Sequence, residues 1–332
     1  MHFLPLSFHR IYRDYIWGPP AERSHLRTLF GRKLPPELPR VAESWEIADL
    51  SPEVSSVVAQ GPWAGRPLHQ LLTEYRTPLL GPHATVERFP FLIKFLDAEQ
   101  RLSVQVHPDE KTAACLGLPP APKTEAWVIL AAEENSRIWA GFRQSVNRGQ
   151  VEAALANGTI SELLHAARPQ AGDCFFLPAG TVHALGGGLF VAEIQQPSDV
   201  TFRLYDWDRR DEQGRSRPLQ IAEALEAIDW GQKPIFPVRA VPGPHPAAET
   251  LVRCPAFVIN RWQLQQRTAL PAGDLCRVLV VLSGTLSVAY SAGDYRAFLP
   301  PGECLLLPAT CRNLLLEPKG KELAVFLEVH LP

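Results

Sequence analysis

The chain has 332 residues and a formal net charge of −2, and 46% of its residues are hydrophobic and 20% charged. This is the composition of a soluble globular protein, and the small net charge argues against nucleic-acid binding driven by bulk electrostatics. No run of 18 apolar residues predicts a membrane span, and six scattered cysteines without a CxxC pair indicate reduced thiols. We therefore expect a cytoplasmic protein without a nucleic-acid or membrane partner.

The first third of the chain predicts two strands and a helix. Alternating apolar and polar residues predict a strand over 41–47, and helical spacing predicts a helix over 68–75 that is closed off from Pro78 onward. Residues 91–97 predict a buried strand, yet Lys94 interrupts its apolar run. Because a buried strand is not expected to carry a charge, Lys94 is a candidate functional residue.

Polar residues occupy one face of the strand predicted over 102–107. Ser103, Gln105 and His107 stand at alternate positions, so a strand places them on one face and three apolar residues on the other. The next predicted strand, over 123–130, also begins with polar residues on one face. Such faces indicate the lining of a barrel or a cleft.

The middle of the chain predicts further helices and strands before a linker. We expect helical structure in 145–167 and 219–228, strands over 191–196 and 200–205, and an interdomain linker in the proline-rich segment 234–246. The remainder is strand-and-turn in character.

A rigid corner presents one histidine. Residues 172–188 read as an apolar strand, a proline–glycine turn and His183 at the start of the next strand. Residues 302–313 repeat this layout with Asn313 in the place of His183. The repetition predicts two copies of one β-barrel, the second without its histidine.

His183 has candidate companions for a metal site. A lone histidine after a turn is more often structural, but Gln105, His107 and Glu125 on neighbouring predicted strands complete a set of two imidazoles, one carboxylate and one amide. Borderline metals such as zinc accept nitrogen and oxygen ligands together. The pattern therefore indicates a metal site with an open position.

Two levels of resemblance follow from these motifs. The corner layout Gly-x5-Pro-x-Gly-x2-His resembles the second conserved motif of cupin barrels, with Gly187 where that motif usually carries Asn. Five segments in order resemble the type I mannose-6-phosphate isomerases in their short bacterial form: 42–46, 103–109, 123–127, 179–184 and 205–209. For the last of these, 205–209, we predict only a structural turn.

The resemblance implies a fold and a cofactor. The fold is mainly β, two cupin (jelly-roll-like) barrels with a small helical insertion, divided into a catalytic domain over 1–235 and a barrel without metal ligands over 236–332. The cofactor is one Zn²⁺ per chain, and the implied ligands are Gln105, His107, Glu125 and His183.

The resemblance also implies an activity, the interconversion of mannose 6-phosphate and fructose 6-phosphate through proton transfer between C1 and C2 and an enediol-type intermediate. Glu193 and Arg203 match an active-site Glu and Arg of the family. Two roles are open for Glu193, the proton-transfer base and the ion-pair partner of Arg203, and one residue can have both. A surface ion pair with Asp199 or Asp206 is the alternative for Arg203.

Three polar residues match positions near the family's site and are predicted to bind the hexose phosphate: Lys94, Ser103 and Lys123. Lys123 has the alternative of reaching solvent from a strand end. A non-catalytic metal-cupin that binds sugar phosphate is the competing function, but it requires no acid/base group such as Glu193. An iron or manganese cupin oxygenase is disfavoured by Gln105, which stands where such enzymes carry a histidine.

Overall fold

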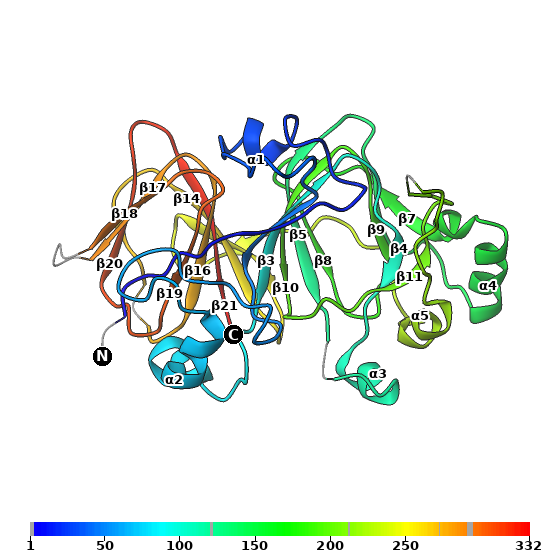
Figure 1. Cartoon of the computed structure of the whole chain (residues 1–332), viewed down its shortest axis with the longest axis horizontal. Helices are drawn as coiled ribbons and strands as arrows, with labels where there is room; N and C mark the ends of the chain where they lie inside the picture. The colour runs from blue at the N-terminus through cyan, green and yellow to red at the C-terminus, as the bar shows by residue number, and fades with distance from the viewer. Residues whose placement is uncertain (1–2, 120–121, 212, 272, 291–294) are drawn as a thin grey trace.

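The computed structural model describes residues 3–119, 122–211, 213–271, 273–290 and 295–332. The chain is mainly antiparallel β-structure, arranged as two lobes side by side along the long axis of the molecule (Figure 1). Each lobe is built from two facing sheets, so the predicted mainly-β fold is confirmed. No helix in the described part of the chain is both long and apolar enough to cross a membrane.

The first lobe contains the strands up to residue 205. Its larger sheet has the spatial order β1 (Ile11–Arg13), β2 (Glu43–Ile47), β3 (Leu92–Ala98), β10 (Leu189–Gln195), β5 (Glu125–Ala132) and β8 (Cys174–Leu177). Its smaller sheet has the order β11 (Phe202–Tyr205), β4 (Val104–Val106), β9 (His183–Leu185), β6 (Ile138–Phe142) and β7 (Leu164–Ala167).

The second lobe repeats this arrangement with later strands. Its larger sheet has the order β12 (Val241–Pro242), β13 (Ala248–Arg253), β14 (Val258–Leu264), β21 (Ala324–His330), β16 (Arg277–Ser283) and β19 (Cys304–Leu307). Its smaller sheet has the order β15 (Thr268–Ala269), β20 (Leu314–Pro318), β17 (Leu286–Tyr290) and β18 (Arg296–Leu299). Strands β8 and β19, which precede the two corners, occupy the same edge position, as the repeated layout predicts.

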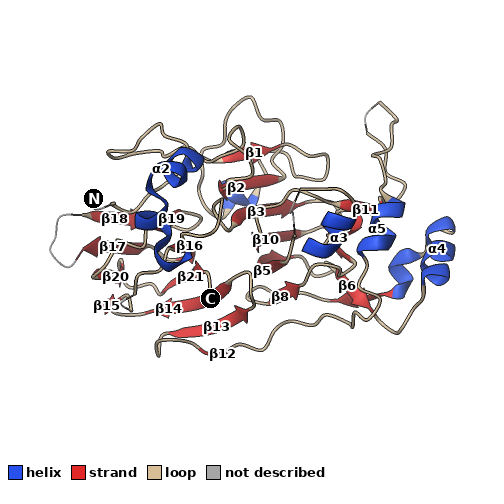
Figure 2. Ribbon diagram, turned by 90° about the horizontal axis from the view of Figure 1, so that it is seen from below, coloured by secondary structure: helices blue, strands red, loops and turns tan. Residues whose placement is uncertain are grey.

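Helices cover the ends of the lobes rather than the sheets between them (Figures 1 and 2). They are α1 (His25–Thr28), α2 (Leu68–Leu80), α3 (Glu110–Cys115), α4 (Arg148–Ala156) and α5 (Ile221–Ala227), with short 3₁₀ turns at Gly81–His83 and Ile160–Leu163. The Asp109 side chain caps α3 by accepting the Thr112 N–H, and Asn147 and Gln150 form a capping box at the start of α4.

Two local predictions were wrong. Helix α2 continues past Pro78 to Leu80, because the chain kinks at Tyr75 and begins a new helical turn in which Pro78 is accommodated. The segment predicted as helical over 145–167 ends in strand β7 rather than helix.

One hydrophobic core cluster spans both lobes, in addition to clusters within each lobe. A single buried cluster contains residues of the first lobe, such as Phe95 and Phe190, together with residues of the second, such as Ile259 and Val278. The N-terminal segment also crosses to the second lobe, where the Leu6 N–H donates to the Leu306 carbonyl at 2.8 Å. The division into 1–235 and 236–332 stays a prediction, because early residues contribute to the packing of both lobes.

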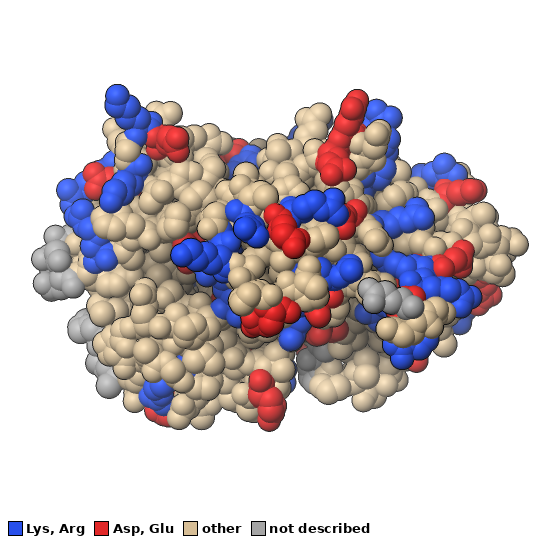
Figure 3. All heavy atoms as spheres, turned by 45° about the horizontal axis from the view of Figure 1, so that its top comes forward, with Lys and Arg blue, Asp and Glu red and all other residues tan. Residues whose placement is uncertain are grey.

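The charged side chains are dispersed. On the face shown in Figure 3, basic and acidic side chains are interspersed between wide uncharged areas. This distribution agrees with the near balance of 33 basic and 35 acidic residues.

Candidate metal centre and adjoining cleft

Three strands of the first lobe bring a carboxylate and two imidazoles together. His107 follows β4, Glu125 begins β5 and His183 begins β9, and all three side chains are buried. The His183 Nε2 lies 3.2 Å from Glu125 Oε1, and the His107 Nε2 lies 3.5 Å from Glu125 Oε2. These three residues can hold a metal ion.

The two histidines are oriented by backbone carbonyls. The His107 Nδ1–H donates to Val200 O and the His183 Nδ1–H donates to Thr181 O, each at 2.9 Å. Each Nε2 therefore presents a lone pair toward Glu125. Burial lowers the pKa of His183 to about 4 and, with the nearby Lys123 and His183, lowers the pKa of His107 well below its ordinary value. Both rings are neutral and able to act as ligands at neutral pH.

Glu125 is a buried carboxylate without hydrogen-bond donors. Neither of its side-chain oxygens accepts a hydrogen bond, although Lys123 Nζ lies 3.2 Å from Oε2. Burial raises the pKa of Glu125 to about 7, and the Lys123 charge opposes this rise. A buried carboxylate requires a cation to stabilise its charged form, and Lys123 is the cation beside Oε2. Oε1 faces the neutral His183, where a metal ion can bind.

The spacing of the cluster fits a small tetrahedral ion. Two ligands that each lie about 2.1 Å from a tetrahedral zinc ion are about 3.4 Å apart. The two nitrogen–oxygen distances in the cluster bracket this value. Gln105 lies beside this cluster: its Nε2 is 3.2 Å from His183 Nε2, and its Oε1 accepts the Ser103 hydroxyl at 3.2 Å. The amide nitrogen thus faces the histidine, and the role of Gln105 as a fourth ligand stays a prediction.

A cleft leads outward from this cluster, and Glu193 lies in its wall. Glu193 is buried on β10, where its Oε1 lies 3.1 Å from Lys94 Nζ and its Oε2 accepts the Trp127 indole N–H at 2.9 Å. Burial alone would raise the pKa of Glu193, but the Lys94 and Lys123 charges lower it below its ordinary value. The ion-pair partner of Glu193 is Lys94 and not Arg203.

Lys94 is itself enclosed by carboxylates. Its Nζ lies 3.3 Å from Glu43 Oε2 as well as 3.1 Å from Glu193. Burial alone would lower the pKa of Lys94, but these two carboxylates outweigh burial and raise it. The positive charge of Lys94 inside its buried strand is thus compensated by Glu43 and Glu193. Lys123 is likewise paired with Glu125.

The structure disfavours the alternative proposed for Arg203. Among the described residues, Arg203 forms no ion pair with Asp199 or Asp206, and its Nε is buried without a hydrogen-bond partner. Its side chain instead lines the same cleft as Glu193 and Lys94. The cleft therefore contains all the predicted catalytic and substrate-binding residues at its wall: Lys94, Ser103, Lys123, Glu193 and Arg203.

Comparison with known proteins places the chain in a family. Residues 6–126 match the family model described as phosphomannose isomerase type I, catalytic domain. A mannose-6-phosphate isomerase of Streptococcus mutans is 34% identical over 317 residues, which cover 93% of this chain and 94% of that protein. A mannose-6-phosphate isomerase of Bacillus subtilis is 32% identical, with 94% of this chain and 96% of that protein covered. The chain belongs to the type I mannose-6-phosphate isomerases.

Solved structures of this family share the fold. The crystal structure of the mannose 6-phosphate isomerase from Bacillus subtilis aligns with 98% of this chain and 99% of its own, at 28% identity and a TM-score of 0.86. A putative mannosephosphate isomerase from Archaeoglobus fulgidus aligns at 20% identity and a TM-score of 0.74, which shows the fold alone. Family membership implies a hexose-phosphate substrate for this isomerase.

Two cleft residues of this isomerase were not predicted from the sequence. Tyr15, from the segment after β1, and Arg217, from the segment before α5, both line the cleft beside Arg203. Neither belongs to a periodic pattern that assigns it a face. Only the closure of the lobe brings them to Arg203.

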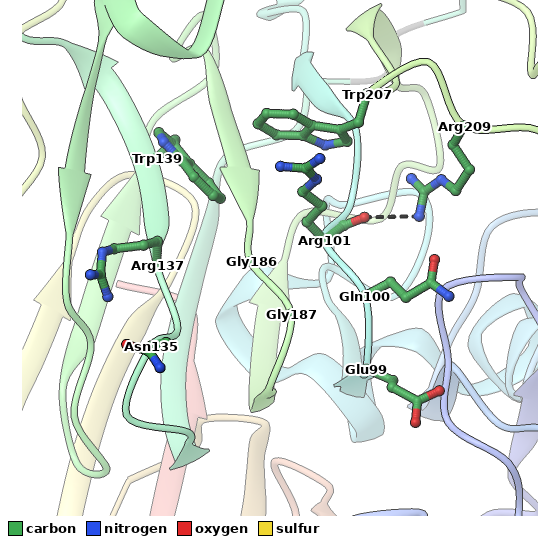
Figure 4. Close-up of a pocket in the computed structure, with 10 residues that line it drawn as sticks. All are labelled: Glu99, Gln100, Arg101, Asn135, Arg137, Trp139, Gly186, Gly187, Trp207 and Arg209. Atoms are coloured by element: carbon green, nitrogen blue, oxygen red, sulfur yellow. Dashed lines mark hydrogen bonds between the residues drawn. The ribbon is translucent and has the colours of Figure 1, made fainter.

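A second, larger hollow of this isomerase, with a volume of about 450 Å³, lies away from the metal cluster. Figure 4 shows Trp139 and Trp207 in its wall, with their ring centroids 5.2 Å apart, and Arg101 against the Trp207 ring. It contains none of the residues predicted for metal, substrate or catalysis. Its size alone therefore does not make it the reaction site, whereas the smaller cleft, about 130 Å³, carries the necessary chemistry.

Proposed function

We propose that this family member is a zinc-dependent aldose–ketose isomerase that interconverts mannose 6-phosphate and fructose 6-phosphate by proton transfer between C1 and C2 through an enediol-type intermediate. The observation that carries the proposal is the buried cluster of His107, Glu125 and His183 beside a cleft whose wall holds an oriented carboxylate. The sequence relatives named above support the same reaction.

Four residues would hold the zinc ion: His107, Glu125 and His183, and Gln105 once its amide is turned so that the oxygen faces the histidines. A bound zinc ion would supply a Lewis acid that polarises oxygen atoms on the reacting carbons. The carbonyls of Val200 and Thr181 hold the two rings with Nε2 toward the site. The donor set of two imidazoles and oxygen ligands, together with the orphaned oxygens of Glu125, fits this ion.

Glu193 is the group that we assign to proton transfer. Its lowered pKa keeps it ionised at neutral pH, as a base must be, and the Trp127 N–H fixes the orientation of one oxygen. The carboxylate would accept the proton from one of the two carbons and return it to the other. Arg203 would place positive charge near the oxygen that becomes anionic in the intermediate. Lys94, Ser103 and Lys123 would contact the substrate at the same wall.

The first test concerns the metal. The purified protein is analysed for bound metal, depleted with a chelator, and assayed for fructose 6-phosphate formation from mannose 6-phosphate before and after Zn²⁺ is restored. We expect activity to be lost with the metal and recovered with Zn²⁺. Full activity in metal-free protein would refute the mechanism, and metal binding without turnover of any hexose phosphate would favour a binding module.

Variants separate the assigned roles. His183→Ala is expected to lose both metal and turnover, whereas Arg203→Ala keeps the metal and loses turnover. Glu193→Gln is expected to keep the metal and to lower kcat by about 10²- to 10⁴-fold, the usual effect of removing a general base. The control is His165→Ala, because His165 packs against Phe236 outside the cluster. Metal loss in the Arg203 variant would mean that its role is structural.

A further inference from the structure

The segment after β11 does more than turn the chain. Asp206 is buried, and its carboxylate accepts two hydrogen bonds from Arg217, at 2.8 Å from Nε and 2.5 Å from Nη2. Arg209 Nη2 donates to the same carboxylate at 2.6 Å. Burial alone would raise the pKa of Asp206, but the two guanidinium groups lower it. One carboxylate therefore serves two arginines.

The turn that positions Asp206 is strained. Trp207 and Asp208 adopt consecutive positive φ angles of 59° and 54°, and the Arg209 N–H closes the turn onto the Asp206 carbonyl at 3.1 Å. A left-handed conformation is costly for a bulky residue such as Trp. The Trp207 indole N–H donates to Leu102 O at 2.6 Å, and this bond helps to hold the conformation. Strain retained at a buried carboxylate points to a function for that carboxylate.

Arg217 is held at the mouth of the reaction cleft next to Arg203. Both guanidinium groups line the cleft, and the pKa of Arg203 is lowered first by burial and then by the positive charge of Arg217. The bidentate contact with Asp206 uses Nε and Nη2 of Arg217 and leaves Nη1 for another acceptor. Two adjacent cations with a free donor are an arrangement suited to an anion.

The charge balance locates the anion at this end. In the deep part of the cleft, Lys94 faces two carboxylates and Lys123 faces Glu125, so neither lysine adds an uncompensated charge. At the other end, Arg203 and Arg217 line the cleft together with Asp199, while Arg209, which lines the other hollow, offsets Asp206; this leaves one net positive charge. A phosphate dianion is better accommodated among the arginines than among the paired lysines.

We propose that Arg217 contacts the phosphate group of the substrate and that Asp206 is the positioning residue that aims its guanidinium. Arg217 would thereby determine the preference for phosphorylated over free hexose. The inference rests on the proposed function, since it assumes that the hexose phosphate enters this cleft with its reacting carbons toward the metal cluster.

The test compares Arg217→Gln, Arg217→Lys and Asp206→Asn with the control Arg215→Gln. Arg215 pairs with Asp211 on the exposed side of the same loop. Loss of a charged hydrogen bond to phosphate predicts a rise of about 10- to 100-fold in the KM for mannose 6-phosphate in Arg217→Gln, with kcat nearly unchanged. Arg217→Lys recovers part of the loss. The double variant Asp206→Asn/Arg217→Gln should have the same KM as Arg217→Gln, because Asp206 acts on the phosphate only through Arg217.

A second readout does not depend on turnover. Inorganic phosphate is titrated into the zinc-loaded protein and its affinity is measured by calorimetry. We expect phosphate binding to weaken at least tenfold in Arg217→Gln and to be unchanged in Arg215→Gln. If phosphate binds in this pattern but neither the parent nor any variant isomerises mannose 6-phosphate, the proposed function fails, and the role of Arg217 in binding phosphate is retained. Unchanged KM and unchanged phosphate affinity in Arg217→Gln would overturn the inference. If Asp206→Asn lowers kcat and leaves KM unchanged, the role of Asp206 is structural and not the positioning of Arg217.

Discussion

Lys94 is the residue whose removal should most directly test the electrostatics of the cleft. Its ammonium lies 3.1 Å from Glu193 and 3.3 Å from Glu43, and all three side chains are buried. The substitution Lys94→Met keeps much of the apolar stem but removes the charge. Two buried carboxylates then face each other without their shared cation. We expect the folded state to lose stability and the two carboxylates to bind protons more readily.

The magnitude follows from the distances. At an effective dielectric constant of about 20, each of the two ion pairs contributes about 5 kcal/mol of attraction. Part of this is offset because the variant no longer buries an ammonium group, which costs several kcal/mol. The expected net loss in the free energy of unfolding is about 3–5 kcal/mol, the usual effect of removing one partner of a buried pair. With an unfolding entropy of about 0.7 kcal/mol/K for 332 residues, Tm should fall by about 4–7 °C.

The assay is thermal and denaturant unfolding of the metal-depleted proteins across pH. Because the pKa of Glu193 is lowered in the folded parent, its stabilising contribution is present above the ordinary Glu pKa of about 4.3 and is lost as the pH falls through the lowered value. The deficit of Lys94→Met should therefore be full near neutral pH and shrink in acid. The double variant Lys94→Met/Glu193→Gln should be more stable than Lys94→Met. A loss below about 1 kcal/mol, independent of pH, would show that these pairs behave as solvent-screened surface pairs and would refute the reasoning.

Two further predictions concern stability away from the cleft. The hydrogen bond from His25 to Asp97 raises the pKa of His25. The stabilisation from this bond is therefore complete below about pH 6.5 and is lost as the pH rises through the pKa of the folded state. In urea unfolding, His25→Gln should destabilise the protein more at about pH 5.5 than at about pH 9, and a pH-independent difference would contradict this. Gly141 has a φ of 68°, and a Cβ there would lie 1.9 Å from the Lys233 carbonyl, so Gly141→Ala should cost about 2–5 kcal/mol. The control Gly117→Ala has the same φ but nothing within 4 Å, and should cost only about 1–2 kcal/mol by the same measurement.

The part of the site that could be predicted from the sequence is the part set by local periodicity. The alternation along β4 assigns Gln105 and His107 to one face, and the structure places them there with His183. Strand β6 was not predicted because its sequence around Gly141 breaks the alternation, and the left-handed glycine bends the strand. Local patterns thus located the ligand types but not β6, the strand that pairs with β9 beside His183.

The residues that only the folded chain reveals are those joined by long-range packing. The pairing of Lys94 with Glu43 links β3 to β2, which are more than forty positions apart in the chain. The contact of Arg217 with Asp206 depends on a strained turn and on the path of the loop after it. Neither relation has a local signal, because side chains that meet across sheets are selected by packing and charge compensation after the strands have paired.

The two lobes show most clearly what the local sequence pattern decides and what the long-range pairing of strands decides. The sequence by itself determined that the corner is repeated and that Asn313 stands where the first copy has His183. Only the sheet register shows that the second lobe differs at another position too. In the second lobe, Arg277 lies opposite His330 and Leu307 on the neighbouring strands. In the first lobe, Glu125 lies opposite Gln195 and Leu177 on the equivalent strands, so Arg277 and Glu125 have the same register position.

A guanidinium thus occupies the strand position that carries the cluster's carboxylate in the first lobe. Arg277 lies 3.0 Å from Glu328, which has the register position of Glu193. In the first lobe, the carboxylate at this strand position faces two neutral imidazoles and a separate cation, Lys123. In the second lobe, the cation stands at the strand position itself and pairs with Glu328. Sequence periodicity fixes which face a residue occupies, but the pairing of distant strands decides which charges it meets.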